Sequence, residues 1–200
     1  MLVSGIKSRP QYLGLEPDLN ARSNLVACDL AGAEAVVEML RSAGDAFAQK
    51  STVFLLDDAG PFSASDLVER LKPADTVIHY QITSIATQLA GLLQGAKMGV
   101  RVYAAGSEPL IGSVVQAAMQ NGIDHMSVRC EHRGSLKRRV QCVHCKGMIE
   151  DVTVNPVQCP HCGLHLLVRD HYSRRLAAFQ GVCINAEDRA DLPEQKVEFP

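Results

Sequence analysis

The sequence predicts an α/β protein in which a parallel-sheet domain is followed by a small C-terminal ribbon, and two observations predict it. Between residues 24 and 131, short apolar runs alternate with segments of helical periodicity, and parallel neighbouring strands need such helical crossovers. Farther along, four of the seven cysteines form two C-x2-C pairs, a pattern typical of a small metal-bound module.

The elements of the first domain follow in order from apolar periodicity. Aliphatic and β-branched runs predict strands, and apolar residues three or four positions apart predict helices. Gly44, Pro73 and Gly122 end three of the helices, because glycine and proline interrupt helical geometry. The expected strands cover 24–28, 52–56, 76–80, 99–104 and 125–129, and the expected helices cover 31–43, 63–71, 82–92 and 107–121.

Four segments are expected along the chain. Residues 1–23 form an N-terminal arm that packs on another surface, and residues 24–131 form the α/β domain. The ribbon, with a following short amphipathic helix at 170–179, occupies residues 137–182. Residues 183–200 carry five carboxylates and two prolines, so we expect an acidic tail that is solvated or partner-bound.

The ribbon is organised around Cys142-Val143-His144-Cys145 and Cys159-Pro160-His161-Cys162. Four thiolates in two close pairs suit the tetrahedral coordination of one Zn²⁺. Gly147 and Gly163 follow the pairs, and glycine adopts the positive φ that such turns require. Because four sulfurs close the coordination shell, we expect a structural zinc site with no catalytic role. Its ligands are Cys142, Cys145, Cys159 and Cys162, and His144, His161 and His165 are expected to lie around it.

Iron is the alternative metal for the same cysteines. A rubredoxin also has two such turns, and its second turn reads C-P-x-C-G, like residues 159–163. The gap between the pairs is short for a rubredoxin and holds no aromatic residue. Zinc is therefore the preferred expectation, and an electron-transfer protein with iron in the ribbon is kept as an alternative.

Composition restricts the partners and the location. A net charge of −2 provides no global basic field that would attract nucleic acid. No apolar run approaches the roughly 18 residues of a membrane span, and residues 1–10 lack the apolar core of a signal peptide. We therefore expect a cytoplasmic protein without membrane or nucleic-acid partners. Basic residues at Arg133 and 137–139 keep a zinc-ribbon nucleic-acid-binding protein as an alternative.

The α/β domain lacks a phosphate-binding loop. After the first expected strand, the chain reads Asp29-Leu30-Ala31-Gly32-Ala33-Glu34, with one glycine and two carboxylates where a phosphate would bind. Residues 81–84, after the third strand, contain no glycine. There is also no G-x-S-x-G, P-loop or H-E-x-x-H motif, so we expect neither catalytic nor cofactor-binding residues in this chain.

One segment resembles a nucleotide-binding lobe. Residues 102–111 are similar to the C-G-P-x-P-M segment of the ferredoxin-reductase family, with Gly106 and Pro109 matching. Ala105 stands where that family has cysteine, and Ser107 where it has the first proline. The resemblance implies a Rossmann-like domain whose nucleotide chemistry has been lost.

The ribbon and its sequel, residues 159–182, resemble the C-terminal signature of the small, DmmA-like subunit of bacterial dimethylamine monooxygenase. The resemblance implies an accessory subunit of a hetero-oligomeric complex that demethylates dimethylamine to methylamine and formaldehyde with O₂ and NADPH. It also implies that haem lies on a catalytic partner subunit, and that FMN and a [2Fe–2S] centre lie on a reductase partner. Whether this chain is itself an enzyme is left open, and a non-catalytic role is preferred.

A partner interface is expected near the ribbon. Arg174 and Arg175 lie in its last expected element, next to His171 and Tyr172. Arginine is enriched at protein interfaces because its planar fork pairs with carboxylates in two places. We therefore predict that these four residues contact another subunit.

Overall fold

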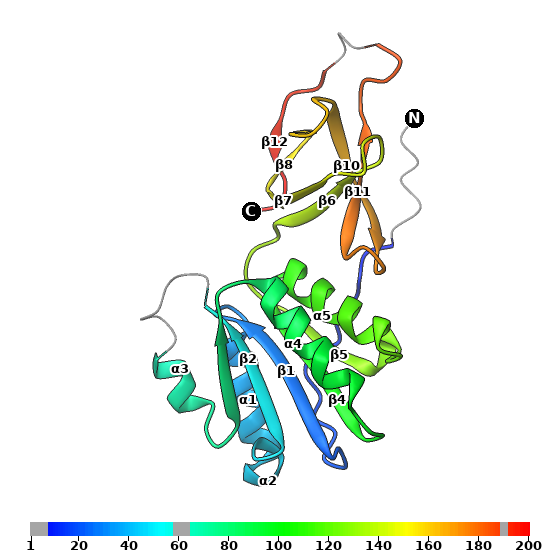
Figure 1. Ribbon diagram of the computed structural model, residues 1–200. Helices are drawn as coiled ribbons and strands as arrows, with labels where there is room; N and C mark the ends of the chain where they lie inside the picture. The colour runs from blue at the N-terminus through cyan, green and yellow to red at the C-terminus, as the bar shows by residue number, and fades with distance from the viewer. Residues whose placement is uncertain (1–7, 58–64, 189–191) are drawn as a thin grey trace. The chain divides into compact units, whose positions relative to one another are not determined.

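The chain folds into two compact units, which are coloured along the sequence in the computed structural model (Figure 1). One unit consists of residues 12–134. The other combines residues 8–11 with residues 135–200. The structure describes residues 8–57, 65–188 and 192–200.

The α/β unit is built on a parallel sheet. Within the described residues, five strands lie in the order β3-β2-β1-β4-β5, and every neighbouring pair runs parallel. The predicted parallel sheet is therefore confirmed. Its strands are β1 (Ser23–Asp29), β2 (Ser51–Leu56), β3 (Asp75–His79), β4 (Val100–Gly106) and β5 (Val128–His132).

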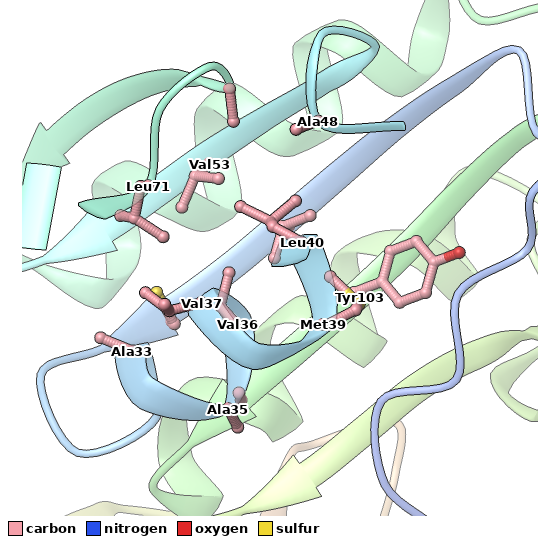
Figure 2. Close-up of a cluster of buried hydrophobic side chains, with 14 of the residues drawn as sticks. Ala33, Ala35, Val36, Val37, Met39, Leu40, Ala48, Val53, Leu71 and Tyr103 are labelled. Atoms are coloured by element: carbon pink, nitrogen blue, oxygen red, sulfur yellow. The ribbon is translucent and has the colours of Figure 1, made fainter. Parts of the chain in front are cut away.

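Helices cover both faces of this sheet because strand side chains alternate between them. Val26, Val53 and Tyr103 pack in a buried cluster with the first helices (Figure 2). Leu25 and Phe54, one position away, belong to a second cluster on the other face. The helices of the first face are α1 (Ala33–Ala43), α2 (Asp45–Ala48) and α3 (Ser65–Arg70), and those of the second are α4 (Ile82–Gln94) and α5 (Glu108–Gln120).

The described residues of the expected arm from Tyr12 onward pack on this unit without regular structure. The Gly14 N–H donates to the Cys130 carbonyl of β5 at 3.0 Å. The Asp18 N–H donates to the buried Tyr103 hydroxyl at 2.9 Å, and the Asp18 carboxylate accepts from Arg101 Nε at 2.6 Å. This segment therefore covers part of the sheet that helices leave open.

The fifth strand begins later than expected. A short 3₁₀ helix, His125–Ser127, occupies the first residues of the predicted strand at 125–129. The Asp124 carboxylate accepts from the Met126 N–H at 2.7 Å and caps this turn. Local capping thus delays β5 until Val128.

The second unit is a β-structure. Its described strands form a sheet in the order β7-β6-β11-β10-β9, and β12 pairs separately with β8. The strands are β6 (Arg138–Cys142), β7 (Met148–Val152), β8 (Val154–Asn155), β9 (Val157–Gln158), β10 (His165–Ser173), β11 (Ala178–Cys183) and β12 (Lys196–Val197).

A buried cation stabilises the core of this unit. The guanidinium of Arg138 lies between the rings of Phe179 and Phe199, at 4.1 and 4.0 Å from their centroids. It donates to the Asp170 carboxylate at 2.6 Å, and only 5% of the Arg138 side chain is exposed. Burial lowers the pKa of Arg138 from its ordinary value, and the hydrogen bond that Arg138 donates to Asp170 opposes this change.

Two expectations for this unit are wrong. The short helix predicted at 170–179 is instead the turn of a hairpin, because β10 continues to Ser173 and β11 starts at Ala178. The acidic tail is not wholly solvated. Within it, β12 pairs with β8, and Phe199 is buried against Arg138.

Candidate metal centre

The structure brings the four predicted cysteine ligands together. The Sγ atoms of Cys142, Cys145, Cys159 and Cys162 all lie within 4.8 Å of one another. Cys142 Sγ is 3.8 Å from Cys162 Sγ, and Cys145 Sγ is 3.7 Å from Cys159 Sγ. A tetrahedron with Zn–S bonds of about 2.3 Å has edges of about 3.8 Å. The sulfurs therefore fit one tetrahedral metal ion and leave no ligand position open.

Each cysteine pair lies in its own turn, and the two turns have the same pattern of backbone hydrogen bonds. The Cys142 carbonyl accepts from the Lys146 N–H at 2.9 Å, and the Cys142 N–H donates to the Gly147 carbonyl at 2.9 Å. In the second turn, the Cys159 carbonyl accepts from the Gly163 N–H at 2.9 Å, and the Cys159 N–H donates to the Leu164 carbonyl at 2.8 Å. This repetition places the two pairs of sulfurs in equivalent positions.

The left-handed residue of the first turn differs from the one expected. Gly163 has a φ of 73°, as predicted, but in the first turn it is Lys146 that has a positive φ, of 65°. Both residues stand four positions after the first cysteine of their pair. The expectation that Gly147, one position later, has this role is wrong: it followed from the ease with which glycine adopts a positive φ, but here lysine adopts that conformation.

Gly147 is required for a different reason. A Cβ atom at this position would overlap the imidazole ring of His161, which comes from the second turn. His161 Nε2 also hydrogen-bonds the Met148 carbonyl at 2.9 Å. The missing side chain therefore lets one turn pack on the other. The lone glycine after Lys146 was the available signal, but its partner was not visible in the sequence.

Without a cation, the four cysteines cannot all be ionised, because their thiolates would repel one another. A backbone N–H of Leu164 favours the thiolate of Cys162, but desolvation and the three neighbouring sulfurs raise its pKa to about 12. Burial disfavours the thiolate of Cys159, yet the N–H groups of His161 and Cys162 and the adjacent thiols lower its pKa overall. The site therefore does not favour four thiolates until a metal ion compensates their charge.

The other predicted ribbon residues differ in exposure. His144, His171, Arg174 and Arg175 are exposed, and the two arginines lie in the turn between β10 and β11. Tyr172 is buried, and its ring contacts Phe179 edge-on at 5.0 Å between centroids. Tyr172 therefore belongs to the core of this unit and does not line a surface as expected. His165 is half-buried at the start of β10.

In the part of the chain that the structure describes, no helix combines the length and the apolar character that crossing a bilayer requires.

Comparisons with known proteins agree with the two-part organisation. The family model described as "Dimethylamine monooxygenase subunit DmmA-like, N-terminal domain" matches residues 4–128, and the corresponding C-terminal domain model matches residues 139–182. A curated relative, the heme-dependent oxidative N-demethylase delta subunit of Ectopseudomonas mendocina (strain ymp), is 30% identical over 119 residues. That match covers 58% of this chain and 65% of the relative, so the chain spans just under two thirds of that protein.

A solved structure is also similar in part. Full-length CYP116B46 from Tepidiphilus thermophilus matches 67% of this chain and 19% of its own chain, at 13% identity and a TM-score of 0.38. This likeness is too low to support an argument. The two family models, by contrast, match well over half of the residues, and the chain therefore belongs to the family of DmmA-like dimethylamine monooxygenase subunits.

Proposed function

We propose that this chain is a non-catalytic, zinc-binding subunit of a cytoplasmic monooxygenase complex that oxidatively demethylates dimethylamine. The overall reaction converts dimethylamine, O₂, NADPH and a proton into methylamine, formaldehyde, NADP⁺ and water. Haem belongs to a catalytic partner, and FMN with a [2Fe–2S] centre belongs to a reductase partner. The observation that carries this proposal is a cluster of four cysteines that fits one metal ion, in a chain whose two parts both match the family.

The metal in this proposal is one structural Zn²⁺. Cys142, Cys145, Cys159 and Cys162 would hold it, and the closed coordination would leave no position for water or substrate. Zinc would then supply folding free energy to the ribbon. The adjoining cluster of buried residues is small, since it consists of two of the ligands and Leu166.

The α/β unit is proposed to be a Rossmann-like domain without nucleotide chemistry. Its support is the strand order around β1 and β4, together with the absence of a glycine-rich loop after β1. In the complex, this unit would bind a partner subunit and would not be the site of NADPH oxidation.

Elemental analysis and a visible spectrum test the proposal, on the chain co-expressed with the haem and reductase subunits. One zinc per chain, a colourless isolated chain and haem and flavin on the co-purifying subunits would support it. Iron in the four-cysteine site, with visible absorption that a reductant bleaches, would contradict the structural role and indicate electron transfer by this chain. Failure to co-purify with either subunit would contradict the subunit role.

The proposed partner interface is the exposed turn that carries Arg174 and Arg175, with His171 beside it. Arg174→Glu combined with Arg175→Glu should weaken co-purification of one partner without changing the zinc content. The matched control reverses two other exposed cations of the same unit, Lys137→Glu with Lys196→Glu. Equal retention of partners by both double variants would exclude this turn as the interface.

A further inference from the structure

In the sheet of the α/β unit, the direction in which the chain adds successive strands reverses between β1 and β4. From β1 the chain moves outward through β2 to β3, and from β4 it moves the other way to β5. The helices that follow, α1 and α5, cover opposite faces of the sheet. In open parallel sheets this position forms a crevice at the carboxyl ends of the strands, where ligands bind. We call it the switch crevice, formed by residues 29–32 of one turn and 105–107 of the other.

The backbone approaches closely in the switch crevice. A Cβ atom on Gly32 would overlap the Ala105 carbonyl, and a Cβ atom on Gly106 would overlap the Asp29 carboxylate. Gly106 also has a φ of 134°, which side chains rarely adopt. Glycine at both positions thus lets the two turns close around the side chain of Asp29.

The Asp29 carboxylate binds the starts of two helices at once. Its Oδ1 accepts from the Gly32 N–H at 2.9 Å, and its Oδ2 accepts from the Ser107 N–H at 2.7 Å. Gly32 and Ser107 are the N-cap residues of α1 and α5, and neither provides a side-chain cap for its own helix. Only 6% of Asp29 is exposed. One buried carboxylate therefore satisfies donors at two positive helix ends.

We propose that the switch crevice is an oxyanion site whose ligand is built into the chain. The Asp29 carboxylate takes the place that a phosphate or carboxylate ligand takes at converging helix N-termini. In the native chain this site is filled, so a nucleotide phosphate is excluded from it by both volume and charge. Removing the carboxylate should convert the crevice into a binding site for a free oxyanion. The inference does not depend on the proposed function.

The test uses the full, metal-loaded chain with Asp29→Ala, which removes a group the size of formate. The unfolding midpoint should fall relative to the native chain, because two helix ends lose their acceptor. Sodium formate should then raise it, recovering about half or more of the fall once formate is well above its dissociation constant. Amide hydrogen exchange of peptides that contain Gly32 and Ser107 should slow in parallel.

Three controls separate specific binding from general effects. Formamide has the shape of formate without its charge and should give no recovery. The native chain and Asp29→Asn, in which the crevice stays filled, should respond to formate much less than Asp29→Ala. Equal formate responses in all three proteins, or equal recovery by formamide, would overturn the proposal.

If Asp29→Ala does not fold, refolding experiments still test the proposal. The measurement is then the yield of folded chain after refolding with formate, with formamide or with neither. Higher recovery with formate alone supports a built-in oxyanion. No recovery with formate, while Asp29→Asn refolds, would show that Asp29 does not act as a replaceable anion.

Discussion

At position 147 the absence of a side chain decides how the two cysteine turns pack. A methyl group there would overlap the His161 ring. We expect Gly147→Ala to separate the turns and lower the zinc affinity by about 10- to 100-fold, the equivalent of a strain of roughly 1–3 kcal/mol. Competition with a chromophoric chelator would measure this change.

The matched control for this prediction is Gly163→Asn. Gly163 lies in the second turn, where a Cβ atom would meet nothing within 4 Å. Asparagine also tolerates the φ of 73° better than other non-glycine residues do. Its zinc affinity should remain near that of the native chain. A similar loss in both variants would mean that turn flexibility, and not the contact with His161, is important.

A second prediction at the residue scale concerns the buried cation Arg138. Asp170→Asn removes its charged partner and should destabilise the ribbon unit by about 2–3 kcal/mol. This is less than for a fully buried pair because 32% of the Asp170 side chain is exposed. Adding Arg138→Met should recover much of the loss, since methionine packs between the two rings without a charge. Denaturant unfolding of the zinc-loaded chain would measure both variants.

The exposed ion pair between Arg139 and Glu150 provides the comparison. Arg139 Nε donates to both Glu150 oxygens, at 2.8 and 2.9 Å, but 53% of the Glu150 side chain is exposed. Glu150→Gln should therefore change stability by no more than about 0.5 kcal/mol. If it destabilised the chain as much as Asp170→Asn does, burial of Arg138 would not be the cause.

Among the elements, the arm residues 12–18 are held to the α/β unit by hydrogen bonds, and the Tyr103 hydroxyl accepts one of them. Tyr103→Phe removes the acceptor of the Asp18 N–H, so we expect a loss of about 1 kcal/mol at pH 7 and faster hydrogen exchange in residues 12–20. Val102→Ala, on the opposite face of the same strand, should destabilise the unit without selectively loosening the arm. Exchange that is unchanged in the arm would contradict this role.

The same substitution has a defined pH dependence. Burial raises the pKa of Tyr103 above its ordinary value of 10.0. The neutral phenol therefore contributes stability that is complete below pH 10 and is lost as the pH rises through the folded-state pKa. The difference in unfolding free energy between the native chain and Tyr103→Phe should thus narrow above pH 10. A constant difference up to pH 11 would show that Tyr103 is not desolvated.

The sequence predicted elements well where the deciding contacts are local. The runs that became β1, β2 and β4 were found because a strand buried on both faces is continuously apolar, and the edge strand β3 was found from its β-branched residues. The four cysteines were found because their spacing alone brings two pairs to one ion. Gly32 and Gly106 were not identified as a pair, since only the strand order places their turns together.

The hairpin of β10 and β11 shows why other elements were mispredicted. Residues 174–179 include arginine, leucine and alanine, which favour helix. Their conformation is instead decided by strand pairing: β11 pairs with β10 and also, in parallel, with β6, about forty residues earlier in the chain. Ala177 adopts a φ of 49° at the turn. Such distant pairings have no signature in a local window.

At the scale of the whole molecule, metal removal should separate the stabilities of the two units. The large apolar clusters belong to residues 12–134, whereas the cysteine cluster and the Arg138 core belong to the other unit. A strong chelator should therefore unfold only the ribbon unit. Calorimetry should show one transition lost and one retained, with Cys162→Ser behaving like the chelated chain. Loss of both transitions would mean that the units fold as one.

The discontinuous second unit has a consequence for biosynthesis. The Ser8 N–H donates to the Asp170 carbonyl at 3.1 Å, and the Ser8 hydroxyl accepts from the Tyr172 N–H at 3.0 Å. Residue 8 leaves the ribosome early, but its partners emerge only after the entire α/β unit has been made. At about 5–20 residues per second, translating the stretch between them takes roughly 8–32 s. A nascent chain stalled before residue 170 should therefore contain a folded α/β unit whose preceding segment is still open to proteolysis.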